Sequence, residues 1–581
     1  MNPINADQKI EIMNYSYKIS KKLALLIVVL AMAFTSCDND ALDETPLDFL
    51  APKNAFESVQ GIRQGITGLH ASVRDIWFTD GPNQDSFAIM LGSLGTDVAF
   101  HGENPGGNRK LANYEAEMTS TNEQFTFFWE TSYRVIQQAN ILIDAINKSD
   151  DDIWSDEGKK NAFLGEALFF RAWVYRFLVP LYGAVPLITE PITFVKTDFE
   201  RTPIQEIYAQ LEQDLIFAAE NLPDPGSEEG PGRITQGAAF HILSEVYLDQ
   251  SKFQLAADAA SMAIDGPYAL MTERFGSTIE AFGSGDVFLD LFGYGNQSSA
   301  ANTEALWVIQ FEPLITGGLK FPGERGWGPA YFRMGNTPDG FKAFRGELVN
   351  GSYTGYLDTL GRPVSWIKPT NYMAYDVWQS DWENDIRNAE HNIKRKFYYD
   401  NPESAYDGQE VDFSLYPEGS RDAIRDTCQY IYPYFLKHAD PLNHFDDPGR
   451  SGGGYNHKDV YAIRLAETYL LRAEAYVGLG NTALAADDIN AIRNRANATP
   501  VAAADVNLDY ILDERARELY AEEFRHITLR RMGKFLEKVR LHNNNPIYPA
   551  CNVQDYNVLF PIPQSQIDLN IDLQFEQNPG Y

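Results

Sequence analysis

Several motifs that mark common enzyme and metal-binding classes are missing from this chain. It has three cysteines in 581 residues, and no two of them form a Cys-x-x-Cys pair, so the sequence offers no zinc or dithiol site. It also lacks a His-Glu-x-x-His pair, a phosphate-binding P-loop and a glycine-rich dinucleotide fingerprint. The absence of these motifs means that the sequence does not favour a zinc peptidase, a P-loop nucleotide hydrolase or a dinucleotide-dependent dehydrogenase.

Basic residues are scarce. The chain has 48 lysines and arginines against 81 acidic residues, a net charge of −33. Such an acidic surface argues against binding to nucleic acids or other polyanions and suits neutral ligands. The hydrophobic content of 44% is enough for one large core or two intermixed cores.

The N-terminal apolar run is too short to span a membrane. It covers the 12 residues 23–34, follows three lysines and leads into Phe34-Thr-Ser-Cys37. This order predicts a lipoprotein signal peptide at residues 1–36, with lipidation of Cys37 by acyl chains such as palmitate. Ordinary cleavage with an incidental Cys37 is the alternative, and translation from Met13 would leave the same signal. Residues 37–53 then form an acidic linker.

A repeated helical hairpin organises the rest of the chain. Small and aliphatic residues recur at three- and four-residue spacing in Val460–Val477 and again in Thr482–Arg495, which predicts two closely packed helices. Residues 234–265 contain the same pattern 229 positions earlier. The identical pairs are Glu245/Glu474, Tyr247/Tyr476, Leu255/Leu484, Ala256/Ala485, Ala257/Ala486 and Asp258/Asp487. We expect a tetratricopeptide-type scaffold, in which each hairpin needs stacked neighbours to bury its apolar face.

Four further helices are expected before the first copy of the hairpin, and an irregular segment is expected after the first of these helices. The periodic segments are 54–74, 122–146, 161–180 and 202–221. Residues 77–107 are rich in glycine, aspartate, asparagine and proline, which predicts a long irregular loop.

Four segments stand out in order along the chain: Arg171–Leu187, Val460–Ala496, Ile511–Arg525, and the tail formed by Leu559–Pro563 with Gln577–Tyr581. Together they resemble the SusD/RagB family of bacterial surface glycan-binding lipoproteins. His526-Ile-Thr528 departs from the more acidic stretch expected after the third segment. The resemblance implies a mainly α fold with a helical part at 54–265, a loop-rich insertion with short strands at 266–459, and a second helical part at 460–581.

The resemblance also implies a function. A non-catalytic lipoprotein, anchored in the outer membrane and facing outward, would capture oligosaccharide or polysaccharide without a cofactor. It would deliver the glycan to a SusC-like TonB-dependent transporter. Acidic residues just after the lipidated cysteine accompany surface display in similar lipoproteins, although here they also fit a plain solvated linker.

The insertion is the region expected to bind the ligand, because long loops in a compact protein are usually functional. It holds five of the nine tryptophans. A sugar needs flat aromatic platforms for its C–H face and polar side chains for its hydroxyl rim. The candidates are Trp77, Trp327, Phe332, Trp366 and Trp378 as platforms, with Asp97, His101, Arg333 and Asn336 as polar partners. The competing interpretation is that each tryptophan packs into the core, as we expect for Trp129, Trp173 and Trp307.

Alternatives stay open. A peptide or another nutrient would suit the same architecture. A glycoside hydrolase would need a pair of carboxylates, and Glu514, Glu518 and Glu522 lie one turn apart, but the neighbouring arginines favour an ion-pair network. The Gly-x-Ser-x-Gly match at 449–453 lacks the strand–turn–helix context of a nucleophile elbow. The acidic segment 400–412 is a weak calcium candidate, and the sequence does not decide whether Cys428 and Cys551 pair.

Overall fold

The computed structural model describes residues 55–79, 91–107, 110–349, 351–443 and 455–581. Residues Ser58–Tyr581 pack as one unit. The predicted signal peptide, Cys37 and the acidic linker lie outside the described residues, as do residues 444–454, which contain the Gly-x-Ser-x-Gly match. Within the described part of the chain, no helix is both long enough and apolar enough to cross a membrane.

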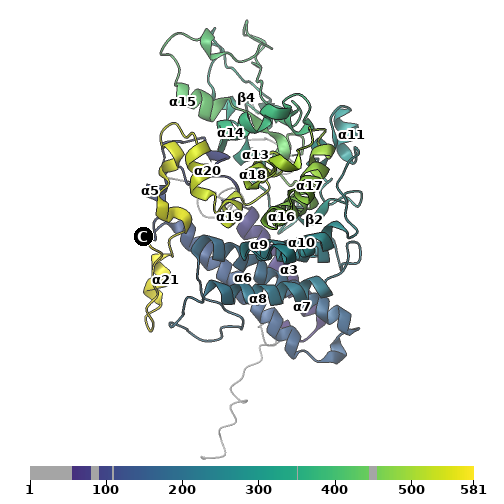
Figure 1. The fold of residues 1–581 in the computed structure, drawn as a ribbon. Helices are drawn as coiled ribbons and strands as arrows, with labels where there is room; N and C mark the ends of the chain where they lie inside the picture. Colours follow the sequence, from purple (N-terminus) through teal and green to yellow (C-terminus); the bar gives the residue numbers. More distant parts are fainter. Residues whose placement is uncertain (1–54, 80–90, 108–109, 350, 444–454) are drawn as a thin grey trace, which may run out of the picture. The chain divides into compact units, whose positions relative to one another are not determined.

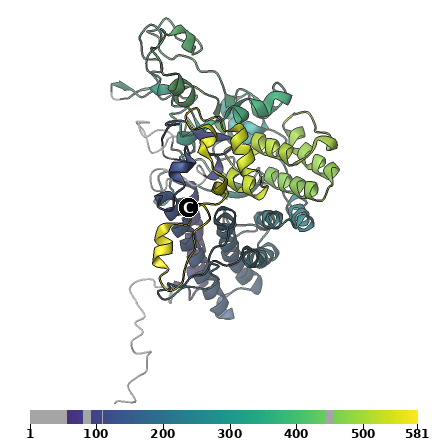
Figure 2. The ribbon, with the colours of Figure 1, turned by 60° about the vertical axis from the view of Figure 1, so that its left-hand side comes forward.

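Antiparallel helices form the scaffold, and each packs on the next from α6 to α10 before α10 packs on α16 (Figures 1 and 2). The helices are α3 (Val59–Val73), α5 (Tyr114–Glu117), α6 (Glu123–Lys148), α7 (Glu157–Tyr182), α8 (Ile204–Asn221), α9 (Gln236–Asp249), α10 (Phe253–Ile264), α16 (Leu465–Gly478), α17 (Thr482–Arg495), α18 (Leu508–Leu519), α19 (Arg525–Arg531), α20 (Phe535–His542) and α21 (Gln564–Leu569). The helices expected from periodicity are confirmed, with ends shifted by a few residues.

Local signals set the helix ends. The Asn122 side chain accepts a hydrogen bond from the Gln124 amide at 2.9 Å and caps α6. Asn481 caps α17 in the same way, through the Leu484 amide. Helix α7 ends at Gly183, whose φ of 75° is a conformation that glycine adopts without strain.

The two related hairpins meet at one arginine. Glu245 on α9 and Glu474 on α16 occupy equivalent positions of the repeat, and both accept hydrogen bonds from Arg531 on α19, at 3.0 Å and at 2.9 and 3.1 Å. Buried alanines of α10 and α17 allow the helices to approach closely. The repeat therefore stacks as predicted, and Arg531, which follows the third family-like segment, connects its two copies.

The prediction that a helix begins at Val460 is wrong. Val460–Arg464 is strand β8, and α16 begins only at Leu465. Strand β8 pairs antiparallel with β2 (Ala305–Ile309), which lies in the insertion, where short strands were expected. Alternating Val-Tyr-Ala-Ile-Arg suits either structure over five residues, so the tertiary partner decides it.

The insertion consists of short elements joined by loops, as expected. Its elements are α11 (Ser277–Phe282), α12 (Val287–Leu291), α13 (Gly323–Trp327), β3 (Leu348–Val349), β4 (Ser352–Tyr353), β5 (Ile367–Pro369), α14 (Asn371–Ala374), β6 (Ile393–Lys394), α15 (Ala423–Arg425) and β7 (Tyr434–Phe435). Strands pair as β3–β4 and β6–β7, and β5 pairs with β1 (Ala99–His101). Strand β1 and a π-helical turn at Arg74–Phe78 show that the predicted loop at 77–107 is partly regular.

Cys428 and Cys551 are both buried free thiols and do not pair. The described residues include no cluster of three side chains suited to hold a metal ion.

Candidate functional site

The four candidate tryptophans are buried and present no face to solvent. Trp77 packs against Trp173 and Phe177, with ring centroids 4.9 and 5.8 Å apart. It belongs to the core of the helical part, with Trp173 and Trp307, which were expected there. Trp77 is therefore not the exposed platform that the sequence suggested.

The tryptophans of the insertion build its own core. Trp327, Trp366 and Trp378 pack in one cluster that also contains Ala516 and Tyr520 from the C-terminal part. The Trp378 Nε1 donates to the Met373 carbonyl at 2.9 Å. A loop-rich segment has little helical packing to stabilise it, so these large side chains are used to bury apolar area. The expected platform of Trp327, Trp366 and Trp378 is not formed.

Two of the predicted polar partners are also internal. Asp97 is fully buried and pairs with Arg525 through both oxygens, at 3.0 and 2.6 Å. His101 is buried at the end of β1, where its Nδ1 accepts from the Asn104 amide at 3.2 Å. Asp97 thus serves the fold, and neither side chain is presented to a ligand at the surface.

The remaining candidates lie at the surface, on one stretch after α13. Phe332 is half-buried beneath the Arg362 guanidinium, 4.3 Å from its ring, while Arg333 and Asn336 are exposed. Arg333 reaches Glu103 at 2.5 Å, which brings the segment after β1 to this stretch. Of the insertion's five tryptophans, Trp382 is the exposed one, at 37%, and the sequence analysis did not select it.

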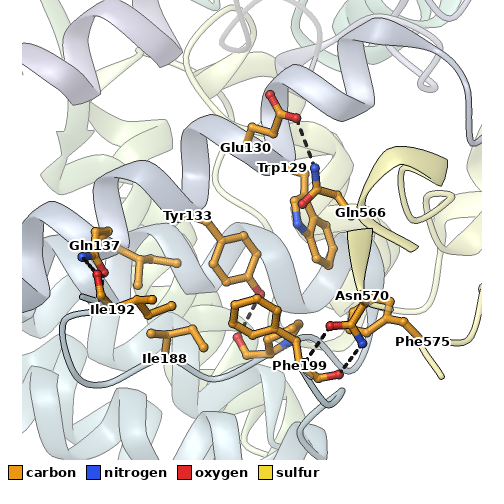
Figure 3. A pocket seen from close by; sticks show the side chains of 12 residues that line it. Trp129, Glu130, Tyr133, Gln137, Ile188, Ile192, Phe199, Gln566, Asn570 and Phe575 are labelled. Carbon is orange, nitrogen blue, oxygen red and sulfur yellow. Dashed lines mark hydrogen bonds between the residues drawn. The ribbon is translucent and has the colours of Figure 1, made fainter. Parts of the chain in front are cut away.

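A pocket lined by aromatic rings lies outside the insertion, and we call it the aromatic pocket (Figure 3). Its volume is about 420 Å³. Three segments far apart in sequence form it: α6, the loop after α7, and the C-terminal tail. The lining residues are Trp129, Glu130, Tyr133, Ile136, Gln137, Pro186, Ile188, Ile192, Phe199, Gln566, Asn570 and Phe575.

Helix α6 supplies one wall. Trp129, Tyr133 and Gln137 follow one another at four-residue spacing and so share one face of the helix. The rings of Trp129 and Tyr133 lie 5.2 Å apart, and Trp129 meets Phe575 edge-on at 6.4 Å. Burial raises the pKa of Tyr133, so its hydroxyl stays protonated and donates to the Pro186 carbonyl at 2.8 Å. Trp129 was expected in the core, and it is buried yet lines the pocket.

Asn570 joins the other two walls. Its Oδ1 accepts from the Phe199 amide at 2.7 Å, and its Nδ2 donates to the Phe199 and Leu573 carbonyls at 3.0 and 2.8 Å. The Asp572 amide also donates to the Thr197 carbonyl at 3.0 Å. These bonds hold Phe199 and the tail against each other at the pocket.

The polar rim contains amides and a single acidic side chain, the carboxylate of Glu130, among residues that are otherwise apolar or aromatic. Gln566 donates to Glu130 at 3.1 Å, and Gln137 exchanges hydrogen bonds of 3.0 Å with the Ile192 backbone. Aromatic faces with planar polar groups at the edge are what a sugar ring requires.

Sequence reasoning missed this pocket. The spacing of Trp129, Tyr133 and Gln137 was a usable signal on α6. The tail gave no comparable signal, because Gln566 and Phe575 lie more than 400 residues away in the chain.

The acidic residues of the third family-like segment form an ion-pair network, as predicted. Glu514 pairs with Arg387, Arg493 and Arg517 at 2.8 Å, and the side chain of Glu518 is equally enclosed. Coulombic attraction to arginines holds the pKa of Glu514 at about 2 against the opposing effect of burial. Carboxylates that are fully buried and paired in this way cannot contact a glycan chain, as the catalytic pair of a glycoside hydrolase would have to do.

Two protein-family models match the chain. The model described as "SusD family" matches residues 331–581, and the one described as "Starch-binding associating with outer membrane" matches residues 77–248. The chain is 26% identical over 579 residues to SusD-like protein P25 of Formosa agariphila, covering 94% of this chain and 97% of that protein. It is also 26% identical over 444 residues to the starch-binding protein SusD of Bacteroides thetaiotaomicron, covering 72% of each.

Solved structures share the fold. A laminarin-binding SusD-like protein superposes with a TM-score of 0.62 at 21% identity, covering 90% of this chain and all of that one. The two matched regions include the first, second and third family-like segments and the tail. The chain therefore contains a SusD/RagB family domain at residues 331–581 and a SusD-like domain at residues 77–248.

Proposed function

We propose that this protein binds neutral oligosaccharides in the aromatic pocket. The observation that carries the proposal is the combination of four rings, from Trp129, Tyr133, Phe199 and Phe575, with an amide-rich rim around about 420 Å³. A volume of this size accommodates a short segment of a glycan chain. Glu130, the one acidic lining residue, would repel an anionic sugar.

The relatives support a glycan as ligand. One is named for starch binding and one solved neighbour for laminarin binding, and both polymers consist of neutral glucose units. The enclosed carboxylates of Glu514 and Glu518 support capture without cleavage. We therefore propose binding without turnover, with a peptide or another nutrient as the alternative ligand.

We further propose that lipidation of Cys37 anchors the protein to the outer face of the outer membrane, and that it passes glycan to a SusC-like TonB-dependent transporter. The apolar run before Cys37 and the family model's description of outer-membrane association support this placement. Replacement of Cys37 by serine should move the protein from the detergent phase to the aqueous phase and lower glycan uptake by cells. Unchanged partitioning would contradict the anchor. Failure of the wild-type protein to co-purify with any TonB-dependent transporter would contradict the partner.

Binding is tested by calorimetric titration of the protein from Asp38 onward with maltooligosaccharides, laminarioligosaccharides and peptides. We expect a neutral glucan to bind and Phe199→Ala to weaken it about tenfold, since removing one stacked ring costs on the order of 1.4 kcal/mol. Phe341→Ala is the matched control, because Phe341 is 40% exposed and lies outside the pocket.

Three outcomes would redirect the proposal. If Arg333→Ala or Trp382→Ala abolishes binding and Phe199→Ala does not, the ligand sits on the insertion, as the sequence analysis expected. Binding of peptides alone would support the alternative nutrient. An increase in the concentration of reducing ends during incubation with a glucan that binds would show that the protein is a hydrolase.

A further inference from the structure

A second pocket of about 360 Å³ has a very different lining, and we call it the basic pocket. It lies between α3, the segment Glu229–Arg233 and strand β2. Its ionisable lining residues are Arg63, His70, Arg74, Glu229 and Arg233. Three arginines around one pocket are unexpected on a chain with a net charge of −33.

The carboxylates near this pocket are already neutralised. Glu229 accepts from Arg63 at 2.5 and 3.1 Å and pairs with Lys159 at 2.8 Å, and these contacts lower its pKa to about 2. Buried Glu166 pairs with Arg233 and contacts His70 at 2.5 Å. The negative charge of each carboxylate is therefore already balanced by these basic side chains.

Arg74 is the cation that these carboxylates leave unbalanced. Its Nη1 and Nη2 donate to the backbone carbonyls of Gln310 and Gly317, at 2.9 and 2.5 Å. Among the described residues it forms no ion pair, and its buried Nε has no hydrogen-bond partner. Burial lowers the pKa of Arg74 while Asp75 beside it acts in the opposite direction, and a guanidinium remains charged throughout the physiological range.

We propose that the basic pocket binds an oxyanion, a carboxylate or a sulfate, next to Arg74. Arg63, Arg74, Lys159 and Arg233 provide four positive charges around the two carboxylates. An incoming oxyanion would supply the missing counter-ion and an acceptor for an unsatisfied guanidinium, with charge-assisted bonds that are among the strongest in proteins. The basic and aromatic pockets share no lining residue, so this site goes beyond the proposed function.

Ala71 offers a test that leaves every described contact of the arginines intact. It is exposed on α3 and lines the basic pocket. Ala71→Glu places a carboxylate where the ligand would bind, and Ala71→Gln adds a side chain of the same size without charge. Calorimetric titrations of the lipid-free protein use sodium sulfate, sodium glucuronate and glucose as probes, at low and at high sodium chloride concentration.

We expect sulfate and glucuronate to bind the wild-type protein and glucose not to bind in this pocket. Ala71→Glu should weaken anion binding at least tenfold relative to Ala71→Gln, and high salt should weaken it in the wild type. Binding of a glucuronate-containing oligosaccharide well above that of free sulfate would assign the anion to a sugar, and equal binding would assign it to a free ion. Absence of anion binding, or equal binding by the two variants, would overturn the proposal.

These outcomes are distinguishable from those for the aromatic pocket. Phe199→Ala should leave anion binding unchanged, and Ala71→Glu should leave neutral glucan binding unchanged. Loss of both activities in either variant would mean that the substitution disturbs the fold, which circular dichroism would reveal. Arg74→Lys, which keeps the charge but not the guanidinium, then serves as the second variant and should retain weakened binding.

Discussion

Replacement of Arg531 by methionine should destabilise the fold more than any surface charge change, because Arg531 fastens the two copies of the hairpin. Its side chain is buried with those of Glu245 and Glu474. Glu245 keeps a second partner, Arg176, at 3.3 Å, whereas Glu474 loses the one ion-pair partner found for it among the described residues. A buried carboxylate left alone costs about 3–5 kcal/mol.

The expected change in melting temperature follows from the size of the unit. A folded unit of about 520 residues has an unfolding entropy of roughly 1.1 kcal/mol per kelvin, so this loss corresponds to a fall of about 3–5 °C. Differential scanning calorimetry at neutral pH measures it. Arg540→Met is the control, because Arg540 and Asp555 are paired but 46% and 88% exposed, and we expect a change of about 1 °C or less.

A second substitution tests the stated cause. Glu474→Gln combined with Arg531→Met removes the unpaired charge and should recover about half of the lost stability. Two results would contradict this reasoning: Arg531→Met lowers the melting temperature no more than Arg540→Met does, or Glu474→Gln brings no recovery. Either would show that the buried ion pairs of Arg531 do not hold the two hairpins together.

Three further predictions concern pH, thiols and the aromatic pocket. Burial raises the pKa of Asp249 to about 7, so its stabilising contribution is present at low pH and lost as the pH rises from about 4 through 7; Asp249→Asn should therefore raise the melting temperature at pH 8 and change it little at pH 4, and the reverse order would refute this. Cys428 and Cys551 are buried with raised pKa values, so the protein from Asp38 onward should react with Ellman's reagent only after unfolding, with two thiols per chain; reaction of the native protein would contradict their burial. Asn570→Ala should weaken glucan binding about tenfold by releasing Phe199, a loss of about 1.4 kcal/mol, and should make the tail more sensitive to proteolysis; unchanged affinity would show that the tail does not shape the site.

The sequence by itself determined the helical scaffold of this protein. Helix α6 begins directly after its capping residue Asn122, and α17 begins directly after Asn481, because capping and three- to four-residue periodicity are local properties. The sequence also showed that Glu245 and Glu474 occupy equivalent positions, since the two copies of a repeat preserve the same residues at the same spacing. Four ordered segments indicated the family, and the ion-pair role of Glu514 followed from its neighbouring arginines.

Only the tertiary structure decided which aromatic residues are available to a ligand. Trp327, Trp366 and Trp378 are buried because a loop-rich insertion has to build its own core, and composition does not say which side of a loop faces inward. Strand β8 is a strand because β2 lies beside it. The aromatic pocket brings α6, the loop after α7 and the tail together across more than 400 residues, and the orphaned Nε of Arg74 depends on contacts with a backbone more than 200 residues away. Such long-range contacts leave no local pattern, so no periodicity or motif could have shown them.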